Sequence, residues 1–149
     1  MARPVTYVGS SVALFLEDVT PGTFVRPCGL TNHTVTFTKN ATEVTVPDCD
    51  DPELPAWIER GVESLDMSGS GNGILAAEAV DAWWAAFNST ESIPARIYIG
   101  SLTDTVNGRL WQGNIHITSF EVTGERGNKA QVSVSFVSDG EMVFSTTTL

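Results

Sequence analysis

Two neighbouring stretches alternate apolar and polar residues and constrain the fold more than any other part of the chain. Residues 110–123 and 129–136 both have the two-residue period of a half-buried β-strand, and they flank a turn at residues 124–128. The first arm changes phase beyond Phe120, and one extra residue at Thr118–Ser119 restores the match between the arms. We therefore predict a long antiparallel hairpin, centred on Arg126, with a β-bulge at that position. The predicted pairs are Val122–Ala130, Phe120–Val132, Ile117–Val134 and Ile115–Phe136.

The polar side of this predicted hairpin carries small, mostly uncharged residues. Solvent-facing strands of monomeric proteins usually carry Lys, Glu and Arg, partly to prevent association between sheet edges. A smooth polar side suits a surface that lines a water-filled space, or a strand that pairs with a neighbouring subunit. A Ser/Thr-rich sheet that simply faces water is equally compatible with these residues. The side chains on this predicted face are Gln112, Asn114, His116, Thr118, Gln131, Ser133 and Ser135.

The remaining chain predicts short strands and one helix. Thr and apolar residues alternate at 34–38, and a turn at residues 39–41 leads to a second short strand at 43–46. The Gly-rich run 69–73 is expected to let the sheet bend before the helix, and Asp139–Gly140 is expected to turn the chain into a last strand at 142–144. Further strands are predicted at 12–16, 62–68 and 94–100, which gives about eight, and residues 23–26 could add another short one. The sequence predicts a single mainly-β domain over residues 1–149, a sandwich or barrel with an extended N-terminal arm at 1–10.

Residues 75–88 form the predicted helix. Apolar side chains recur at the helical spacing and predict one face packed on the sheet. The predicted apolar stripe contains Ala76, Val80, Trp83 and Phe87, broadened by Ala79 and Trp84.

Residues 48–60 differ in kind from the rest of the chain. This stretch holds two prolines, five acids and one base, and it has no strand period. Long loops inside compact domains are uncommon and often functional. Leu54, Trp57 and Ile58 supply an apolar anchor, and a loop that needed only solubility would not require a tryptophan. We expect Trp57 to dock on a partner, with folding back onto its own core as the alternative.

Charge and composition exclude several classes of function. The chain has 18 acidic and 8 basic residues, a net charge of −10, which would repel phosphate backbones and anionic membranes. No segment reaches the length of a transmembrane helix, and no apolar signal core begins the chain.

The two cysteines, Cys28 and Cys49, are too few for a disulfide scaffold. Because they flank the predicted 34–46 hairpin at similar distances they could lie near one another, but we expect thiols rather than a disulfide.

Motifs for catalysis and cofactor binding are weak. The glycines at 69, 71 and 73 do not have the spacing of a dinucleotide-binding loop, and no P-loop lysine follows them. His33 and His116 are isolated in the sequence, and the acids at 48–51 lack the EF-hand pattern. No nucleophile motif places a histidine beside Cys28 or Cys49. We expect neither an enzyme nor a bound metal or cofactor.

The sequence resembles the major tail tube proteins of long-tailed phages, particularly those of phage-like gene transfer agents. The resemblance covers most of the chain and rests on the order and spacing of several segments. These segments are 28–31 (Cys-Gly-Leu-Thr), 46–52 (Val-Pro-Asp-Cys-Asp-Asp-Pro), 55–60 (Pro-Ala-Trp-Ile-Glu-Arg), Gly113, 118–125, 132–135 and 138–140.

The resemblance implies a β-sandwich with a flanking helix whose strands join those of neighbours into one ring-shaped barrel. Six-membered rings would stack into a hollow tube that conducts DNA, assembled in the bacterial cytoplasm and carried in the tail of a virion or gene-transfer particle. The expected partners are copies of the chain, the tail terminator, the distal tail protein and the tape measure, with DNA present only in transit. The seven polar-face residues would line the lumen. The expected contacts between rings are Asp48, Asp50, Asp51, Leu54, Trp57, Ile58 and Arg60.

Two other functions fit the sequence less well. A β-sandwich module that binds carbohydrate would use exposed tryptophans as stacking platforms, but the sequence places Trp83 and Trp84 on the helix and Trp111 on the apolar side of its strand. A different ring-forming tail component, such as a tail terminator, would share the fold.

Overall fold

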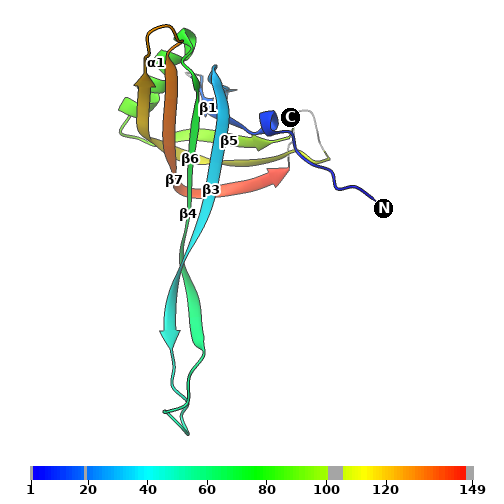
Figure 1. Ribbon diagram of the computed structural model, residues 1–149, viewed down its shortest axis with the longest axis vertical. Helices are drawn as coiled ribbons and strands as arrows, with labels where there is room; N and C mark the ends of the chain where they lie inside the picture. Colours follow the sequence, from blue (N-terminus) through cyan, green and yellow to red (C-terminus); the bar gives the residue numbers. More distant parts are fainter. Residues whose placement is uncertain (1, 19, 101–105, 147–149) are drawn as a thin grey trace.

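One antiparallel sheet, one α-helix and one short 3-10 helix (η1) make up the described part of the fold. The computed structural model describes residues 2–18, 20–100 and 106–146. Within them the sheet has seven strands in the order β2-β1-β5-β6-β7-β4-β3. The predicted mainly-β class with one helix is confirmed (Figure 1). In chain order the elements are η1 (Gly9–Ser11), β1 (Ala13–Glu17), β2 (Phe24–Val25), β3 (Leu30–Thr45), β4 (Ile58–Ile74), α1 (Ala77–Asn88), β5 (Ile93–Ile99), β6 (Arg109–Thr123) and β7 (Gln131–Thr146).

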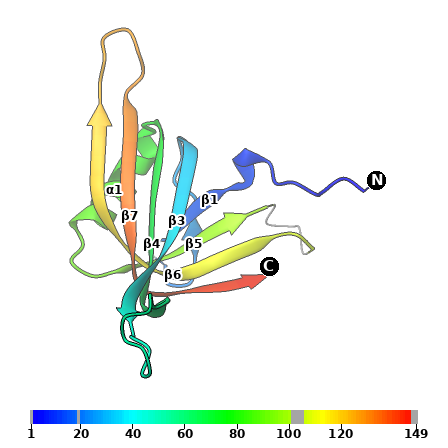
Figure 2. The ribbon, with the colours of Figure 1, turned by 60° about the horizontal axis from the view of Figure 1, so that its bottom comes forward.

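The sheet folds over on itself because β6 and β7 change partners along their length. β6 pairs with β5 only up to Ile115, and β7 pairs with β4 only from Gln131 to Val137. One half of the sheet therefore contains β3, β4 and the adjoining parts of β6 and β7, and the other half contains β1, β2, β5 and the remaining parts. Figure 2 shows the strands of the two halves running in different directions. The two halves enclose one core as in a sandwich, without closing into a barrel.

Irregularities in the β6–β7 pairing accompany the bend of both strands. The predicted bulge is confirmed, because the register shifts between Ile117 and Ser119. The predicted pairs were wrong by two residues: Phe120 faces Val134 and Ile117 faces Phe136. The error arose because the connection between β6 and β7 spans residues 124–130, which is longer than the tight turn expected around Arg126. Because a shift of two residues preserves which side of the sheet each side chain occupies, the prediction of the two faces survives the error.

Residues 139–140 do not form the predicted turn. They lie within β7, which runs without interruption from Gln131 to Thr146, so the separate last strand at 142–144 was also wrong. A second register shift opposite Gly113, between Gln112 and Asn114, places extra residues of β7 there. Gly140 has φ +88°, and a Cβ on Gly113 would come within 2.7 Å of the carbonyl oxygen of Glu141. Both glycines therefore permit a bulge, for which the sequence signal resembles that of a turn.

The region from 30 to 74 departs most from the prediction. The expected turn at residues 39–41 does not exist, and the segments 34–38 and 43–46 belong largely to one strand, β3, whose partner is β4. Lys39 faces Leu65, and Thr42 faces Gly61. The glycines of residues 69–73 continue β4 rather than bending the chain. Cys28 and Cys49 lie beyond opposite ends of β3, about 50 Å apart at 3.3 Å a residue, and both are free thiols.

The core lies between the two halves of the sheet and beneath the helix. Its fully buried members include Met67, Ile97, Ile115 and Val134, with Trp83 of α1. The helix begins at Ala77, two residues later than predicted, and its buried residues are Ala79, Trp83 and Ala86. Trp84 and Phe87 were wrongly assigned to the buried stripe, since 54% and 40% of their surface is exposed. Small alanines allow the helix to approach the sheet. The rings of Trp84 and Phe87 lie together beside that face, with centroids 5.9 Å apart, and remain partly in solvent.

Gly69→Ala is expected to destabilise the fold. The new Cβ would overlap the Phe136 ring and lie 2.7 Å from the carbonyl oxygen of Thr34. Overpacking of this kind costs about 1–3 kcal/mol of unfolding free energy, measurable by urea denaturation. Gly124→Ala is the matched control, because nothing lies within 4 Å of its added Cβ. Equal stability of the two variants would contradict the close packing of β4 on Phe136.

Candidate assembly surfaces

A polar face covers the outer side of the β6–β7 hairpin. Residues on the other side of these strands, such as Ile115, Val132 and Val134, are at most 2% exposed, whereas the seven predicted polar residues are all exposed or half-buried. Thr118 Oγ donates a hydrogen bond to the carbonyl oxygen of Ser135 at 3.2 Å. The folded sheet separates Gln112 from most of this set, because Gln112 pairs with Arg96 in the other half.

Sequence reasoning missed that β3 and β4 extend this face. The register places Ser70 between Ser135 and Thr34, in one row across three strands. The next row has Asn72 between Ser133 and Asn32, with Asn32 Nδ2 donating to Asn72 Oδ1 at 2.9 Å. The signal was present in the alternation of Ser68, Ser70 and Asn72 with three glycines. We use "polar face" from here on for these outward residues of β3, β4, β6 and β7.

Charge on the polar face is sparse and acidic. Glu121 pairs with Ser133 in the register, and Asp139 lies opposite Asn114. The Oδ2 atom of Asp139 is 3.4 Å from Nε2 of His116, and both side chains are partly exposed. The described rows of the polar face run from Asn32 to Thr38 on β3 and as far as Thr123 on β6. No outward residue in these rows is Lys or Arg. The polar face is therefore one to which a phosphate backbone would not adhere.

Within the described part of the chain, two strand edges of this half of the sheet have no strand beside them. β3 ends the sheet order on one side. On the other side, the part of β6 after Ile115 has β7 as its only partner among the described strands, because the β5 pairing stops there. β3 contains no proline, and its only charged side chains that could protect the edge are Lys39 and Glu43. Unprotected edges of this kind are suited to pairing with another chain.

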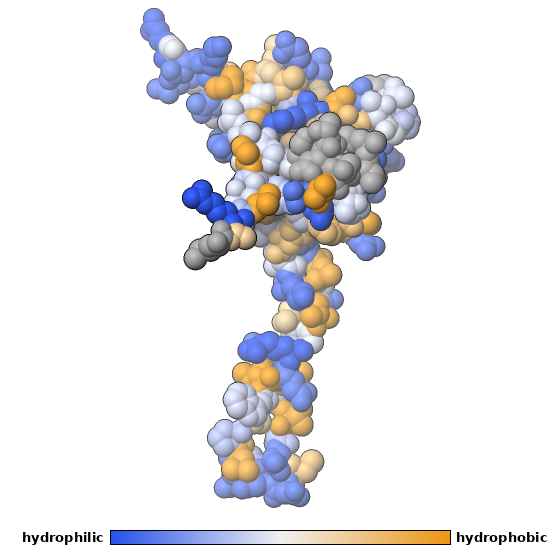
Figure 3. All heavy atoms as spheres, turned by 90° about the vertical axis from the view of Figure 1, so that its right-hand side faces the viewer, coloured by the Kyte–Doolittle hydropathy of each residue, from blue (hydrophilic) through white to orange (hydrophobic). Residues whose placement is uncertain are grey.

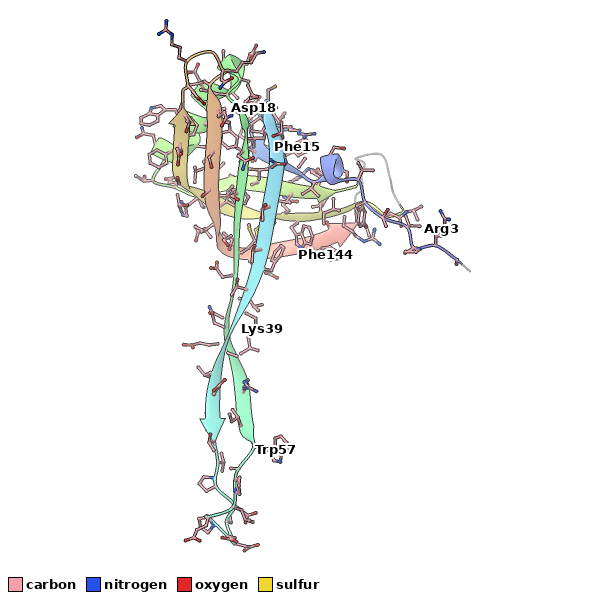
Figure 4. All side chains as sticks on the ribbon, in the orientation of Figure 1. Arg3, Phe15, Asp18, Lys39, Trp57 and Phe144 are labelled. Carbon is pink, nitrogen blue, oxygen red and sulfur yellow. The ribbon has the colours of Figure 1, made fainter. Side chains whose placement is uncertain are left out.

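The β3–β4 hairpin projects far beyond the sheet, as Figures 1 and 4 show. β7 pairs with β4 only from Ser68 onward, so residues 38–45 and 58–66 pair only with each other. We call this two-stranded part the hairpin shaft and residues 46–57 the hairpin tip. Leu65, Val62 and Val44 on the shaft are 73%, 59% and 55% exposed, and apolar atoms recur along it in Figure 3. An isolated two-stranded ribbon with uncovered apolar side chains is a feature of interaction surfaces.

The hairpin tip holds most of the predicted ring contacts. Asp48 Oδ1 accepts hydrogen bonds from the backbone N–H groups of Asp50, at 2.8 Å, and Asp51, at 3.2 Å. The backbone N–H of Leu54 donates to the carbonyl oxygen of Asp51 at 3.2 Å. Ile58 and Arg60 lie instead at the start of β4, where Arg60 Nε donates to Glu43 Oε1 at 3.1 Å. The tip is thus locally ordered without a core.

Trp57 is 93% exposed, which excludes the alternative that it folds back onto its own core. It lies on the protruding hairpin and away from the body of the sheet (Figure 4). Trp83, by contrast, is fully buried. The apolar surface of an indole in water is unfavourable in free energy. Burial of the Trp57 side chain by a partner would recover that free energy.

The groups that could support chemistry do not converge. Within the described residues, no three His, Cys, Asp or Glu side chains are placed to hold a metal ion. Burial, and secondarily the charge of Arg26, lowers the pKa of His33 below its ordinary value. The lowered pKa favours the neutral imidazole of His33. No described carboxylate forms an ion pair with this imidazole to orient it. No helix in the described part of the chain is long and apolar enough to cross a membrane.

A comparison with family models identifies the family to which the chain belongs. The model for phage tail tube proteins matches residues 7–144. The chain belongs to the phage tail tube protein family. No curated protein sequence matches it significantly.

Solved structures share the fold of this tail tube protein. The tail of an empty gene transfer agent particle, refined with C6 symmetry, matches with TM-score 0.76 at 20% identity, over 95% of this chain and 100% of that one. The virion of a native gene transfer agent particle matches with TM-score 0.73 at 20% identity and the same coverage. The SPP1 tail tube matches with TM-score 0.67 at 14% identity, over 95% of this chain and 80% of that one.

The two tryptophans of opposite exposure give a direct stability test for this tail tube protein. Trp83→Ala removes a fully buried indole and is expected to cost about 3–5 kcal/mol of unfolding free energy. Trp57→Ala removes a side chain without intramolecular burial and should change stability by less than about 0.5 kcal/mol. Denaturant unfolding of the monomer measures both. A large loss of stability from Trp57→Ala would show that the tip is packed on the body.

Proposed function

We propose that this tail tube protein assembles into six-membered rings that stack into a hollow tube and conduct DNA. The observation that carries the proposal is the combination of two unpaired strand edges with a polar face between them. Membership of the tail tube family supports it. So does the shared fold with a gene transfer agent tail refined with C6 symmetry.

Rings would form by pairing the two edges of neighbouring copies. The edge of β3 on one subunit would join β6, over residues 116–123, on the next. These are different surfaces, so the contact is heterologous and closes into a ring when the rotation allows. Six four-stranded halves would then form one continuous barrel, satisfying backbone groups that a lone subunit leaves to water.

The polar face would line the lumen. Its Ser, Thr, Asn and Gln side chains offer a wetted surface, and the absence of Lys and Arg from its described rows removes the side chains that would hold phosphates. Glu121 and Asp139 add mild repulsion. DNA would pass without adhering, since nonspecific DNA affinity arises mainly from neutralised phosphates. In this arrangement Gln131, Ser133, Ser135, His116 and Thr118 contact the channel water.

The hairpin would connect one ring to the next. Its shaft and tip extend beyond the sheet that forms the ring, and their apolar side chains need a covering partner. These contacts would be made by Asp48, Asp50, Asp51, Leu54 and Trp57 of the tip, together with Ile58 and Arg60.

The role of the protein is structural, without catalysis or a cofactor. The other partners would be the terminator, distal tail and tape measure proteins, with assembly in the bacterial cytoplasm and a final place in the particle tail.

Trp57→Ala is expected to leave a folded subunit that no longer forms tubes. The indole is 93% exposed in the subunit, and interface tryptophans at protein contacts commonly contribute about 2 kcal/mol or more. Light scattering and negative-stain electron microscopy over a concentration series measure assembly. Trp84→Ala, on the exposed side of α1, is the matched control and should assemble normally. Tubes of ordinary length from Trp57→Ala would contradict the stacking role of the tip.

Introducing lysine on the polar face should slow DNA passage. Ser133→Lys with Ser135→Lys would add twelve positive charges to each ring of six, where DNA phosphates pass closest. Assembled particles should release DNA more slowly, most clearly at low salt, as followed by dye uptake of the released DNA. Asn88→Lys at the end of α1 controls for added charge off this face. Unchanged release from the double variant would contradict a lumenal position.

A further inference from the structure

The hairpin tip and the β6–β7 loop, residues 124–130, lie at opposite ends of the subunit. Figure 1 shows the loop beside α1 at one end of the long axis and the tip at the other. Copies stacked head to tail along this axis bring the tip of one against the loop end of the next. The two surfaces differ, so the contact repeats without closing and produces a filament. Because both surfaces belong to the same chain, their complementarity in charge can be examined from this sequence alone.

The two ends carry opposite charge. The tip contains four acids in six residues, Asp48, Asp50, Asp51 and Glu53, and no base. The β6–β7 loop contains Arg126 and Lys129, and nowhere else in a chain of net charge −10 do two basic residues lie within four positions. Glu125, the one acid of the loop, accepts a hydrogen bond from Asn128 Nδ2 at 3.2 Å.

The charged groups at both ends are available for contact. Arg126 and Lys129 are exposed, and neither forms an ion pair with any described residue. At the tip, the carboxylates of Asp48 and Asp51 accept backbone hydrogen bonds. Those of Asp50 and Glu53 accept none within the described chain. The loop end also carries acids, among them Asp18 (Figure 4), and Arg26 lines the same hollow as Asp18. The loop differs in that two bases, Arg126 and Lys129, lie close together in it, which specifies where an acidic tip can dock.

We propose that the β6–β7 loop is the receiving surface for the hairpin tip of a second copy in the adjacent ring. Arg126 and Lys129 pair there with the carboxylates of Asp50 and Glu53, and Trp57 supplies the neighbouring apolar contact. This inference rests on the proposed function and names the partner of its stacking surface. Single exposed pairs are weak, but the same pairs recur in every subunit around the ring. The pairs set the register of stacking and make it sensitive to salt.

Charge reversal with rescue tests the pairing. Arg126→Glu with Lys129→Glu should raise the concentration needed for tube formation at least tenfold at low salt, with an unchanged melting temperature. Asp50→Lys with Glu53→Lys should do the same, since these two carboxylates support no contact inside the tip. The quadruple variant restores opposite charges and keeps the wild-type net charge, so it is the matched control. It should return tube formation to within about threefold of wild type.

The outcomes separate the inference from the proposed function. Wild-type tubes together with unimpaired assembly of Arg126→Glu/Lys129→Glu would overturn the inference and leave the tube function standing. Impaired assembly that the quadruple variant fails to rescue would also overturn it, because the loss would then not depend on opposite charge. A wild-type chain that forms neither rings nor tubes at any salt concentration would remove the proposed function and the inference with it. Mutual rescue, abolished by raising the salt concentration, is the supporting result.

Discussion

The two-residue period of side chains along β6 and β7 determines both the core and the outer surface of this subunit. Each strand is long enough to belong to both halves of the folded sheet. Ile115, Ile117, Val132, Val134 and Phe136 lie on the inner side, and their burial fixes the register, because a slip of one residue would expose all of them. The bulges bend the strands without losing this alternation.

The same alternation leaves the subunit incomplete on its outer side. Once the apolar residues of β6 and β7 are committed to the core, the polar residues form a smooth surface with unprotected edges at β3 and at residues 116–123 of β6. The β3–β4 shaft has no second layer beneath it, so Leu65 and Val62 remain in solvent. A monomer that ended here would be prone to aggregation. In the proposed assembly the same features would become the surfaces that join subunits, and the stability of the subunit would be separate from the stability of the polymer.

The sequence predicted correctly those parts of the fold in which a local residue pattern is compatible with only one kind of structure. The phase change near Phe120 located the bulge, and the helical spacing around Trp83 located α1. Glycine has several meanings, and this ambiguity caused the main errors. Gly140 indicated a turn but permits a bulge. The glycines of 69–73 indicated a bend but lie inside one continuous strand, where Gly69 makes room for Phe136 and Gly73 for the backbone of β3 and the residue before it. The length of the connection after Thr123 shifted the register by two residues, which no pattern within the strands could reveal.

The assembly surfaces were only partly predictable for a different physical reason. Polar residues of β6 and β7 could be assigned to one face from their own period. The extension of that face over Ser70, Asn72, Thr34 and Asn32 depends on which strands are neighbours, and such pairing is nonlocal. The projection of residues 46–57 beyond the body could not be foreseen, because the shaft was expected to be separate short strands. The exposure of Trp57 agrees with the prediction that it does not serve the core of its own chain.

In the proposed assembly, unpaired edges of neighbouring subunits join and place the polar face inside a tube. Cryo-electron microscopy of polymers formed by the purified protein tests it most directly. We expect six copies in each ring, β3 of one copy hydrogen-bonded to residues 116–123 of the next, and Ser133 and Ser135 facing the lumen. Polymers in which these edges stay unpaired, or in which Ser133 and Ser135 face the outer solvent, would contradict the account.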